Sequence, residues 1–506
     1  MRRLALLGAV VLALVVVAAL AWSTKPAPRQ SAVAGGQVAA VTSITRSCPP
    51  AAAGAGTTTH ISMIAVPAQA ASAKGATAVS TGSATLSAVP AAAASPAATK
   101  PAKKPAKKTS TKTASVTKSA SAAPVTVSEP GAATTVTAPS AGDAAGTALA
   151  VTGQMAEGFE AEQATSAGLG LVSCSHPSSD MWFVGSGAPD VQLYLMNTGA
   201  LAASVNVNIL TDTGQENALT DAITVAPDQV IEENIAPYVR GAQAVALEVQ
   251  TSSGQVAASL WESNATGSGA WVPQSAEPST TLVIPGLTVA SSAARLFVTV
   301  PGQADARVKV VAYTPAGAFQ QFSTVPVQAS AGATTPVTLS SLGASAAGLE
   351  LTSNVPIVAG VLVAGSGIGS FATAVAPVTE QGVVAGNPAS AGLTVGLLLT
   401  APGAAATASV SVISADGTVT SPASLQGLTV AAGRTLAVTV PRPPGRQPFS
   451  IVLRPTAVSG PLYAARVVTS GSGGLSAPLV SLLPVQSALT EITLPAAQNT
   501  YTAVLP

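Results

Sequence analysis

Two histidines and two cysteines are the residues of this chain that are best suited to nucleophilic or metal chemistry. His176 stands in Cys174-Ser175-His176, with Asp180 four residues further on, and His60 is the other histidine. A Cys/His pair can supply a nucleophile and a base only while the cysteine is a free thiolate. A zinc site needs a second Cys or His pair at ligand spacing, which this segment lacks. We therefore predict no catalytic, metal or cofactor-binding residue.

The two cysteines favour a disulfide between Cys48 and Cys174. An even cysteine count is typical of exported proteins, in which bonded pairs persist. The bond would close a loop of more than one hundred residues, which corresponds to about 4–5 kcal/mol on chain-entropy grounds. The alternative is a pair of separate buried thiols.

Three glycine-rich turns argue against a nucleotide site. Gly365-Ser-Gly-Ile-Gly369 follows a strand pattern and invites comparison with a phosphate-binding loop. That loop requires a helix at its third glycine and an acidic residue about 20 positions later, and neither is evident here. Gly267-Ser-Gly269 and Gly471-Ser-Gly473 stand at equivalent places further along the chain. A glycine turn that recurs in this way indicates a structural hairpin.

Carboxylates and aromatic residues are sparse. Glu157, Glu160 and Glu162 form the main acidic cluster, and aromatic residues make up 3% of the chain. A glycosidase needs two convergent acids and a cleft that can hold the sugar, so this composition argues against one. Trp182, with Trp261 and Trp271, is interpreted as a core anchor; the alternative is a binding platform in which Trp182 contacts a partner.

Lysines are concentrated in one segment. Seven of the ten lie between Lys100 and Lys118, where no acidic residue occurs, so the rest of the chain is mildly acidic. The formal net charge of the whole chain is +1, which predicts no general attraction to nucleic acid. The run either contacts an anionic wall polymer or lipid headgroups, or is a solvated spacer. Its candidate contact residues are Lys103, Lys104, Lys107 and Lys108.

The first residues predict export. Met1-Arg2-Arg3 precedes an uncharged run from Leu4 to Trp22, which would rise about 28 Å as a helix, close to the thickness of a bilayer core. The two arginines favour an N-terminus left in the cytoplasm. We expect residues 1–24 to be an uncleaved membrane anchor; the alternative is a signal peptide cleaved near Ala21.

The next segments differ in composition. Residues 25–66 end in a β-rich stretch, from Thr57 to Val66, that can join a later sheet. Residues 67–147 are Ala/Ser/Thr/Pro-rich and contain the lysine run. Such a segment has few large apolar side chains to offset the entropy of ordering, so we predict that it is disordered.

Beyond residue 190 the chain repeats at intervals near one hundred residues. The units begin at Leu193-Tyr-Leu-Met-Asn-Thr-Gly199, Leu296-Phe-Val-Thr-Val-Pro-Gly302 and Leu397-Leu-Leu-Thr-Ala-Pro-Gly403. Each continues with alternating apolar residues and a turn glycine, which is typical of half-buried strands. About seven short strands in each unit favour a sandwich of immunoglobulin-like size, whereas a three-bladed propeller falls below the usual minimum of about four blades.

We therefore predict an all-β chain with three tandem β-sandwich modules. The N-terminal helix and the disordered segment precede them. The predicted module boundaries are 148–285, 286–386 and 387–506.

The sequence resembles a family of uncharacterised actinobacterial secreted or membrane-anchored proteins, a domain of unknown function. The shared features are an N-terminal membrane signal, Cys48-Pro49, Leu171-Val-Ser-Cys174-Ser-His-Pro177 leading into Asp180-Met-Trp-Phe-Val-Gly185, and the Pro356-Ile-Val-Ala-Gly360 strand. The resemblance implies export and β architecture, and it transfers no activity and no catalytic residue.

The favoured function is that of a non-catalytic cell-envelope protein, with scaffold or interaction modules displayed outside a membrane to which the N-terminal helix binds. The alternative is a protein that binds a cell-wall glycan or polymer. An exported hydrolase is the third hypothesis, and it requires convergent acids or a Cys/His pair in a cleft.

Overall fold

The protein is described from a computed structural model, and the regular elements of its described residues are strands and three short 3-10 helices. This confirms the predicted all-β class. The residues that the structure describes are 37–51, 58–67, 81–92, 123–139, 145–165, 170–216, 221–288, 294–319, 326–339, 346–363, 369–456, 459–476 and 478–494.

The chain divides into two compact units. The smaller unit contains the two ends of the chain, and its described part is an antiparallel pair of strands, β1 (Gln37–Ala40) and β36 (Glu491–Leu494). The larger unit spans Val41–Thr490 and contains all other strands that the structure describes.

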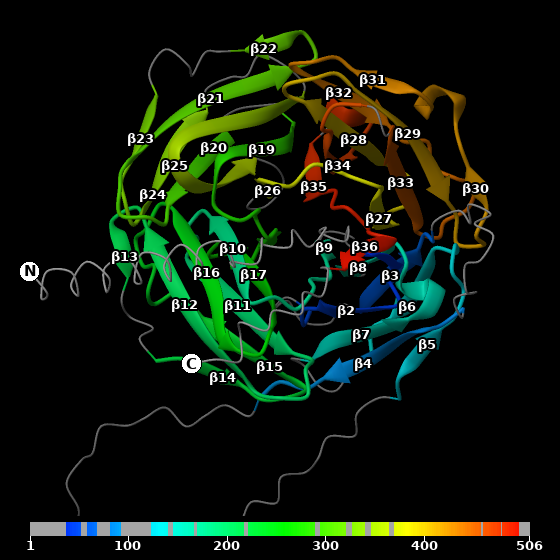
Figure 1. The fold of residues 1–506 in the computed structure, drawn as a ribbon, viewed down its shortest axis with the longest axis horizontal. Helices are drawn as coiled ribbons and strands as arrows, with labels where there is room; N and C mark the ends of the chain where they lie inside the picture. The colour runs from blue at the N-terminus through cyan, green and yellow to red at the C-terminus, as the bar shows by residue number, and fades with distance from the viewer. Residues whose placement is uncertain are drawn as a thin grey trace, which may run out of the picture. The chain divides into compact units, whose positions relative to one another are not determined.

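Eight sheet-forming segments, in the same order each time, build four sandwiches in the larger unit, A to D (Figure 1). In each sandwich, one sheet has the segment order first, sixth, third, fourth, and the other has fifth, second, seventh, eighth. All the pairings are antiparallel, so each strand buries alternate side chains against the opposite sheet.

Sandwich A combines strands from both sides of the lysine run. One sheet has the order β2-β7-β4-β5 and the other β6-β3-β8-β9. The strands are β2 (Ser43–Cys48), β3 (Thr59–Ala65), β4 (Ala84–Val89), β5 (Val125–Val127), β6 (Thr134–Thr137), β7 (Gly146–Thr152), β8 (Phe159–Thr165) and β9 (Val172–Ser173), with the 3-10 helix η1 (Gly153–Ala156) between β7 and β8.

Sandwich B has the sheet orders β10-β16-β12-β14, with β13 also on β12, and β15-β11-β17-β18. Alternate residues of β12 are buried along most of its length, as the repeat pattern predicts. The strands are β10 (Asp180–Gly185), β11 (Asp190–Asn197), β12 (Ala203–Thr211), β13 (Gly214–Glu216), β14 (Ile223–Val225), β15 (Gln229–Asn234), β16 (Val245–Ser253), β17 (Ala257–Ser263) and β18 (Gly269–Val272).

Sandwich C differs in one long strand. β25 spans 17 residues; it pairs with β19 and β21 in one sheet and then with β20 and β26 in the other. It thereby serves as both the sixth and the seventh segment. The strands are β19 (Ser279–Leu287), β20 (Ala294–Val300), β21 (Ala306–Thr314), β22 (Gly317–Phe319), β23 (Val327–Ala329), β24 (Ala333–Leu339), β25 (Ala347–Val363) and β26 (Ser370–Thr373).

Sandwich D repeats the order of sandwich B, as β27-β33-β29-β31, with β30 also on β29, and β32-β28-β34-β35. The strands are β27 (Gly382–Asn387), β28 (Leu393–Ala401), β29 (Ala406–Ile413), β30 (Val419–Thr420), β31 (Leu428–Val430), β32 (Arg434–Thr439), β33 (Phe449–Pro455), β34 (Tyr463–Ser470) and β35 (Leu479–Pro484), with the 3-10 helices η2 (Ala423–Leu425) and η3 (Gly474–Ser476).

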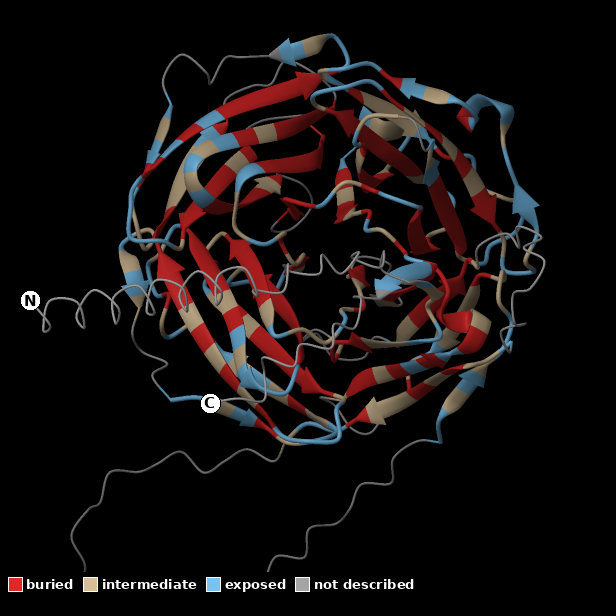
Figure 2. Cartoon of the chain, in the orientation of Figure 1, coloured by how far each residue is buried: buried red, intermediate tan, exposed pale blue. Residues whose placement is uncertain are grey.

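Each sandwich has an apolar core between its sheets, and further apolar clusters join one sandwich to the next (Figure 2). Val89 and Val172 of A contact Met196 of B, and Trp182 of B contacts Phe297 of C. The core of C continues into D through Leu398 and Val467 of D. These contacts explain why β17 is buried along its whole length.

Sandwich D also contacts sandwich A, so the interfaces form a closed cycle within this unit. β27 of D packs against β3 and β8 of A, and Ile64 of A shares an apolar cluster with Val383 and Val452 of D. At all four interfaces the sheet with the first segment of one sandwich meets the sheet with the second segment of the next. Such head-to-tail contacts close when the rotation between repeats sums to a full turn.

Several sequence predictions are corrected here. The chain has four sandwiches instead of three, because sandwich A is assembled from strands that lie before, within and after the low-complexity segment. Within the segment predicted to be disordered, residues 84–89, 125–127 and 134–137 are strands. In the segment 148–285 that we assigned to one module, β8 and β9 belong to sandwich A, and β10 begins sandwich B.

The predicted N-terminal anchor at residues 1–24 lies outside the described residues. In the part of the chain that the structure describes, no helix is long and apolar enough to cross a membrane.

Candidate functional site

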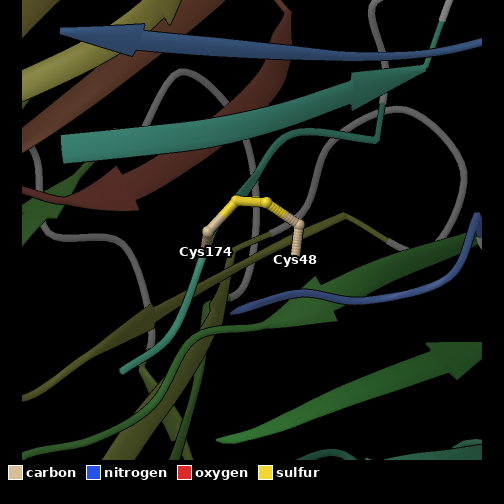
Figure 3. Close-up of a disulfide and its surroundings, with 2 residues drawn as sticks. All are labelled: Cys48 and Cys174. Atoms are coloured by element: carbon tan, nitrogen blue, oxygen red, sulfur yellow. A yellow bond between two sulfur atoms is a disulfide. The ribbon is translucent and has the colours of Figure 1, made fainter. Parts of the chain in front are cut away.

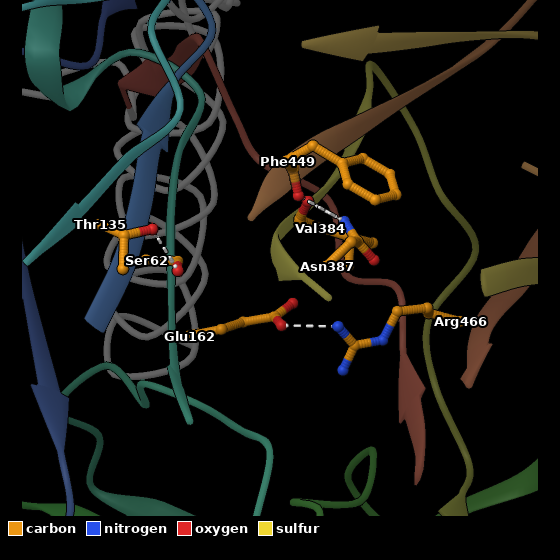
Figure 4. A network of polar contacts seen from close by, with 7 residues as sticks. All are labelled: Ser62, Thr135, Glu162, Val384, Asn387, Phe449 and Arg466. Atoms are coloured by element: carbon orange, nitrogen blue, oxygen red, sulfur yellow. Dashed lines mark hydrogen bonds and ion pairs between the residues drawn. The ribbon is translucent and has the colours of Figure 1, made fainter. Parts of the chain in front are cut away.

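A buried ion pair joins sandwiches A and D. Glu162 lies on β8 of A and Arg466 on β34 of D, and Arg466 Nη1 donates a hydrogen bond of 2.9 Å to Glu162 Oε2 (Figure 4). Both side chains are almost fully buried, with 4% of Glu162 and 0% of Arg466 exposed. β34 is otherwise apolar through most of its length, so this arginine is held inside a hydrophobic strand. The pair therefore links two sandwiches that are distant in sequence.

A second ion pair lies next to the first. Glu160, two residues before Glu162 on β8, is 3.5 Å from Arg46 Nη2 on β2. Burial raises the pKa of Glu160, and the charge of Arg46 opposes this rise. Burial also raises the pKa of Glu162 to about 7. The charge of Arg466 lowers this pKa, and the charge of Glu160 raises it further. Glu162 therefore changes charge near neutral pH.

Several polar atoms of this cluster have no hydrogen-bond partner among the described residues: Nε and Nη2 of Arg466, Nε of Arg46 and Oδ1 of Asn387. Asn387 Nδ2 donates to the carbonyl oxygens of Val384 and Phe449. A carboxyl group with a pKa near 7 is suited to general acid–base chemistry in principle. Glu162, however, is enclosed between two sandwiches and bonded to Arg466, so its geometry serves the interface between A and D.

The predicted disulfide is confirmed. A disulfide joins Cys48 and Cys174, which are 126 positions apart in the sequence (Figure 3). Ser47 and Ser175 beside them exchange backbone hydrogen bonds of 2.8 and 2.9 Å, so the bond links two paired segments of sandwich A. Cys174 is consequently not a thiolate. His176 nearby has a pKa that burial and the charge of Arg46 both lower.

The tryptophans that the structure describes lie between sandwiches. Trp182, which we interpreted as a core anchor with partner contact as the alternative, is 2% exposed and shares an apolar cluster with Phe297 and Val358 of sandwich C. Trp261 and Trp271 contact each other edge to face, with ring centroids 5.1 Å apart, in the interface between A and B. The reason is geometric: four sandwiches in a cycle bury both faces of many strands, and the large side chains fill the interfaces.

The other predicted positions are distributed as follows. The candidate lysine contacts, Lys103, Lys104, Lys107 and Lys108, lie outside the described residues, and so does most of the glycine-rich segment 365–369. Gly267 and Gly471 are in turns with positive φ, at 79° and 107°, as a hairpin role requires. Among residues that the structure describes, no group of three His, Cys, Asp or Glu side chains could hold a metal ion.

A cavity of about 620 Å³ lies where the connections between sandwiches come together; we call it the hub cavity. Its wall takes residues from A, B, C and D, including the segments 274–279 and 374–377 that lead from B to C and from C to D. Leu282, Val283 and Val375 make part of the wall apolar. Its polar lining includes His176, Gln274, Glu277, Tyr463, Gln486 and Ser487, with Ser275, Ser279 and Thr281.

Sequence reasoning missed both Arg466 and the hub cavity. A signal for Arg466 was present, because an arginine within Tyr463-Ala-Ala-Arg-Val-Val468 is unusual in a strand that is otherwise apolar. Glu160 and Glu162 were noted as a cluster, but their separation by one residue, which puts both on one face of a strand, was not used. The hub cavity has no comparable signal, since its residues come from five separate segments.

Comparison with known proteins gives a family and no relative of established function. The chain belongs to a family of unknown function, DUF5719, whose model matches residues 125–441. The match begins at β5 and ends just after β32, so it includes sandwiches B and C and parts of A and D. No curated protein and no solved structure matches significantly.

Proposed function

We propose that this member of the DUF5719 family is a non-catalytic, extracytoplasmic protein of the cell envelope, a scaffold that contacts another envelope component. The observation that carries the proposal is the closed cycle of four sandwiches. The ion pair of Glu162 and Arg466 and the buried tryptophans lie between sandwiches. An arrangement of this kind favours a rigid body with extended outer surfaces.

An extracytoplasmic location is supported by the disulfide. Disulfides persist in oxidising compartments and are rare in the cytosol. The bond between Cys48 and Cys174 is the only cysteine pair in the sequence. The cationic start and the apolar run from Leu4 to Trp22 point the same way, toward an anchor or a cleaved signal. An actinobacterial source is the remaining part of this proposal and follows from the sequence resemblance.

Contact with the envelope is proposed to involve the connection between β4 and β5, which contains the lysine run at residues 100–118. Seven positive charges without a nearby acid would attract an anionic wall polymer or lipid headgroups. The two strands that this segment connects, β4 and β5, pair in one sheet of sandwich A.

Fractionation of cells, with intact-mass measurement of the protein, tests the location. We expect the protein in the envelope fraction, two mass units lighter than the reduced chain because the disulfide is formed. The mass also shows whether residues 1–21 remain. A fully reduced protein in the cytosolic fraction would contradict the proposal.

A pull-down with isolated cell wall tests the contact. Deletion of residues 93–122 is the appropriate variant, because it shortens one connection and spares β4, β5 and β6. A second variant replaces Lys103, Lys104, Lys107 and Lys108 with glutamine and keeps the length. We expect the full chain to sediment with the wall and both variants to sediment less. This difference should be larger at low salt, where charges are screened less. Sedimentation that is equal for all three proteins would exclude the lysine run as the contact.

A further inference from the structure

We propose that the hub cavity binds a neutral, hydroxyl-rich saccharide. This inference rests on the proposed function as an envelope-binding protein, and it names the ligand class and the site. The free polar groups of the wall, its charge, its apolar part and its size support this inference.

Five side chains of the wall are available to a ligand. His176, Glu277 and Gln486 are exposed, and Gln274 and Tyr463 are half-buried. In the described part of the chain, none of the five makes a side-chain hydrogen bond or ion pair within the protein, whereas Ser487 is occupied by Thr379 and Pro377. These side chains come from three sandwiches or their connections. Because they make no such bonds, contacts within the fold do not require them to meet in one cavity.

The donors and acceptors of this set are mixed. The two glutamines each offer an amide donor and a carbonyl acceptor, and Tyr463 offers a hydroxyl, whose pKa is raised by burial, so that it stays protonated. Burial and Arg46 lower the pKa of His176, which keeps the imidazole neutral near pH 7, with one donor and one acceptor. Hydroxyl groups, which donate and accept at the same atom, match such a wall, and phosphate or sulfate groups, which only accept, do not.

The charge of the wall points the same way. Glu277 is its only formally charged side chain apart from the histidine. A single carboxylate accepts hydrogen bonds from hydroxyl groups and repels an anionic ligand. The site therefore differs from the lysine run, whose positive charge would attract an anionic polymer.

The apolar part of the wall and the size of the cavity complete the match. Leu282, Val283 and Val375 are buried side chains of the wall, which Tyr463 also lines. Sugars have an apolar C–H face that packs on such surfaces, while their hydroxyl groups meet the polar side chains. The volume of about 620 Å³ lies within the ~300–1,000 Å³ range that is usual for ligand pockets.

Isothermal titration of the full chain tests the inference with defined probes: maltotetraose, cellotetraose, the β-1,4-linked N-acetylglucosamine tetramer and, as the anionic comparison, tetragalacturonate. We expect at least one neutral tetrasaccharide to bind, and to bind more tightly than tetragalacturonate. Gln274→Ala combined with Gln486→Ala should weaken that binding by about tenfold or more, because two hydrogen-bonding amides are removed.

Gln215→Ala provides the matched control, since Gln215 is an exposed glutamine on β13 with no role in the cavity. It should bind as the wild type does. The thermal unfolding midpoint of the double variant should be unchanged, because neither glutamine bonds to the protein. The inference is overturned if no neutral probe binds at about 5 mM, if tetragalacturonate binds best, or if the double variant binds normally.

The outcome is separable from that of the proposed function. If the double variant still sediments with isolated cell wall but no sugar binds, the inference about the hub cavity fails and the envelope contact stands. If sugar binds in solution but the full chain does not sediment with the wall, the reverse holds.

Discussion

The interface between sandwiches D and A and the interface between B and C have the same head-to-tail arrangement but different chemistry. Between B and C, Trp182 and Phe297 meet in an apolar contact, with a hydrogen bond from Thr334 Oγ1 to the carbonyl of Leu210. Between D and A, the apolar side chains are smaller, and the ion pair of Glu162 and Arg466 lies in the contact. Consecutive repeats are held together by the chain, whereas D and A are the two repeats that are farthest apart in sequence.

The difference suggests what a buried ion pair contributes to a protein of similar repeats. A buried pair adds little net stability over an apolar contact, but a single buried charge without its partner is costly. Any arrangement that put another face against A or D would leave Glu162 or Arg466 alone. Charge complementarity thus selects the correct neighbours where apolar faces, rich in Val and Ala in every repeat, do not discriminate.

The largest effect is expected from Arg466→Ala. Removal of the guanidinium leaves Glu162 buried without its partner, so the free energy of unfolding should fall by about 3–5 kcal/mol at pH 8. Urea denaturation measures this loss. The double variant Glu162→Met with Arg466→Met should recover most of it, since an apolar pair of similar volume fills the same space. A double variant as unstable as the single one would show that the pair itself stabilises the contact.

Phe297→Ala probes the apolar interface. Loss of this fully buried ring should reduce the free energy of unfolding by about 3 kcal/mol, through the transfer term and the cavity left behind. The loss should be the same at pH 5 and pH 8, because the cluster around this ring consists of apolar side chains. A loss that varied with pH would remove the contrast between the two interfaces.

The pH dependence of stability should come in part from the D–A interface. The folded protein raises the pKa of Glu162 from 4.5 to about 7, so it binds the proton more strongly than the unfolded chain. This contribution to stability is fully present below pH 4.5 and is lost as pH rises toward 7, which corresponds to at most about 3 kcal/mol. Glu160 and Glu262, whose pKa values are also raised by burial, act in the same direction.

Glu162→Gln should therefore flatten the fall in stability between pH 5 and pH 8, as measured by urea denaturation at intervals across this range. Glu129→Gln is the matched control, because Glu129 is exposed, and its profile should follow the wild type. Identical profiles for both variants would mean that Glu162 does not titrate between these pH values.

The smallest effects are expected at two interface glycines. A Cβ at Gly348 of sandwich C would meet the Thr400 side chain of D, which is β-branched and hydrogen-bonded to Thr435 at 2.9 Å. Gly348→Ala should cost about 1–3 kcal/mol, since this neighbour has no room to move. At Gly146, between A and B, the closest neighbour is the flexible end of Met196, so Gly146→Ala should cost less than about 1 kcal/mol. Thermal unfolding of both variants checks the order, which equal shifts would contradict.

Prediction from sequence succeeded where a local pattern was sufficient. Alternation in residues 203–210 and 306–312 predicted strands, and these residues lie in β12 and β21, which both begin with alternately buried residues. It failed for sandwich A, because β4 and β5 belong to one sheet but are separated by a segment with no repeat pattern. The Ala-rich strand Ala84–Val89 has too few large side chains to be recognised, and only its pairing with β7 makes it a strand.

The candidate sites divide in the same way. The disulfide could be predicted because the chain has two cysteines, but the role of Trp182 could not, since whether an aromatic residue faces a partner or a neighbouring sandwich depends on the docking of sheets. The hub cavity collects residues from five segments, and no spacing along the chain connects His176 with Gln486.

The sequence by itself determined the all-β class, the strands of the repeats and the cysteine pair, because alternation and composition act over a few residues. The tertiary structure decided that four sandwiches close on one another, that Glu162 meets Arg466 across 304 residues, and that a cavity lies at the connections. The physical reason is that closure depends on the rotation between successive repeats, summed around the cycle, and no local pattern of side chains encodes that sum.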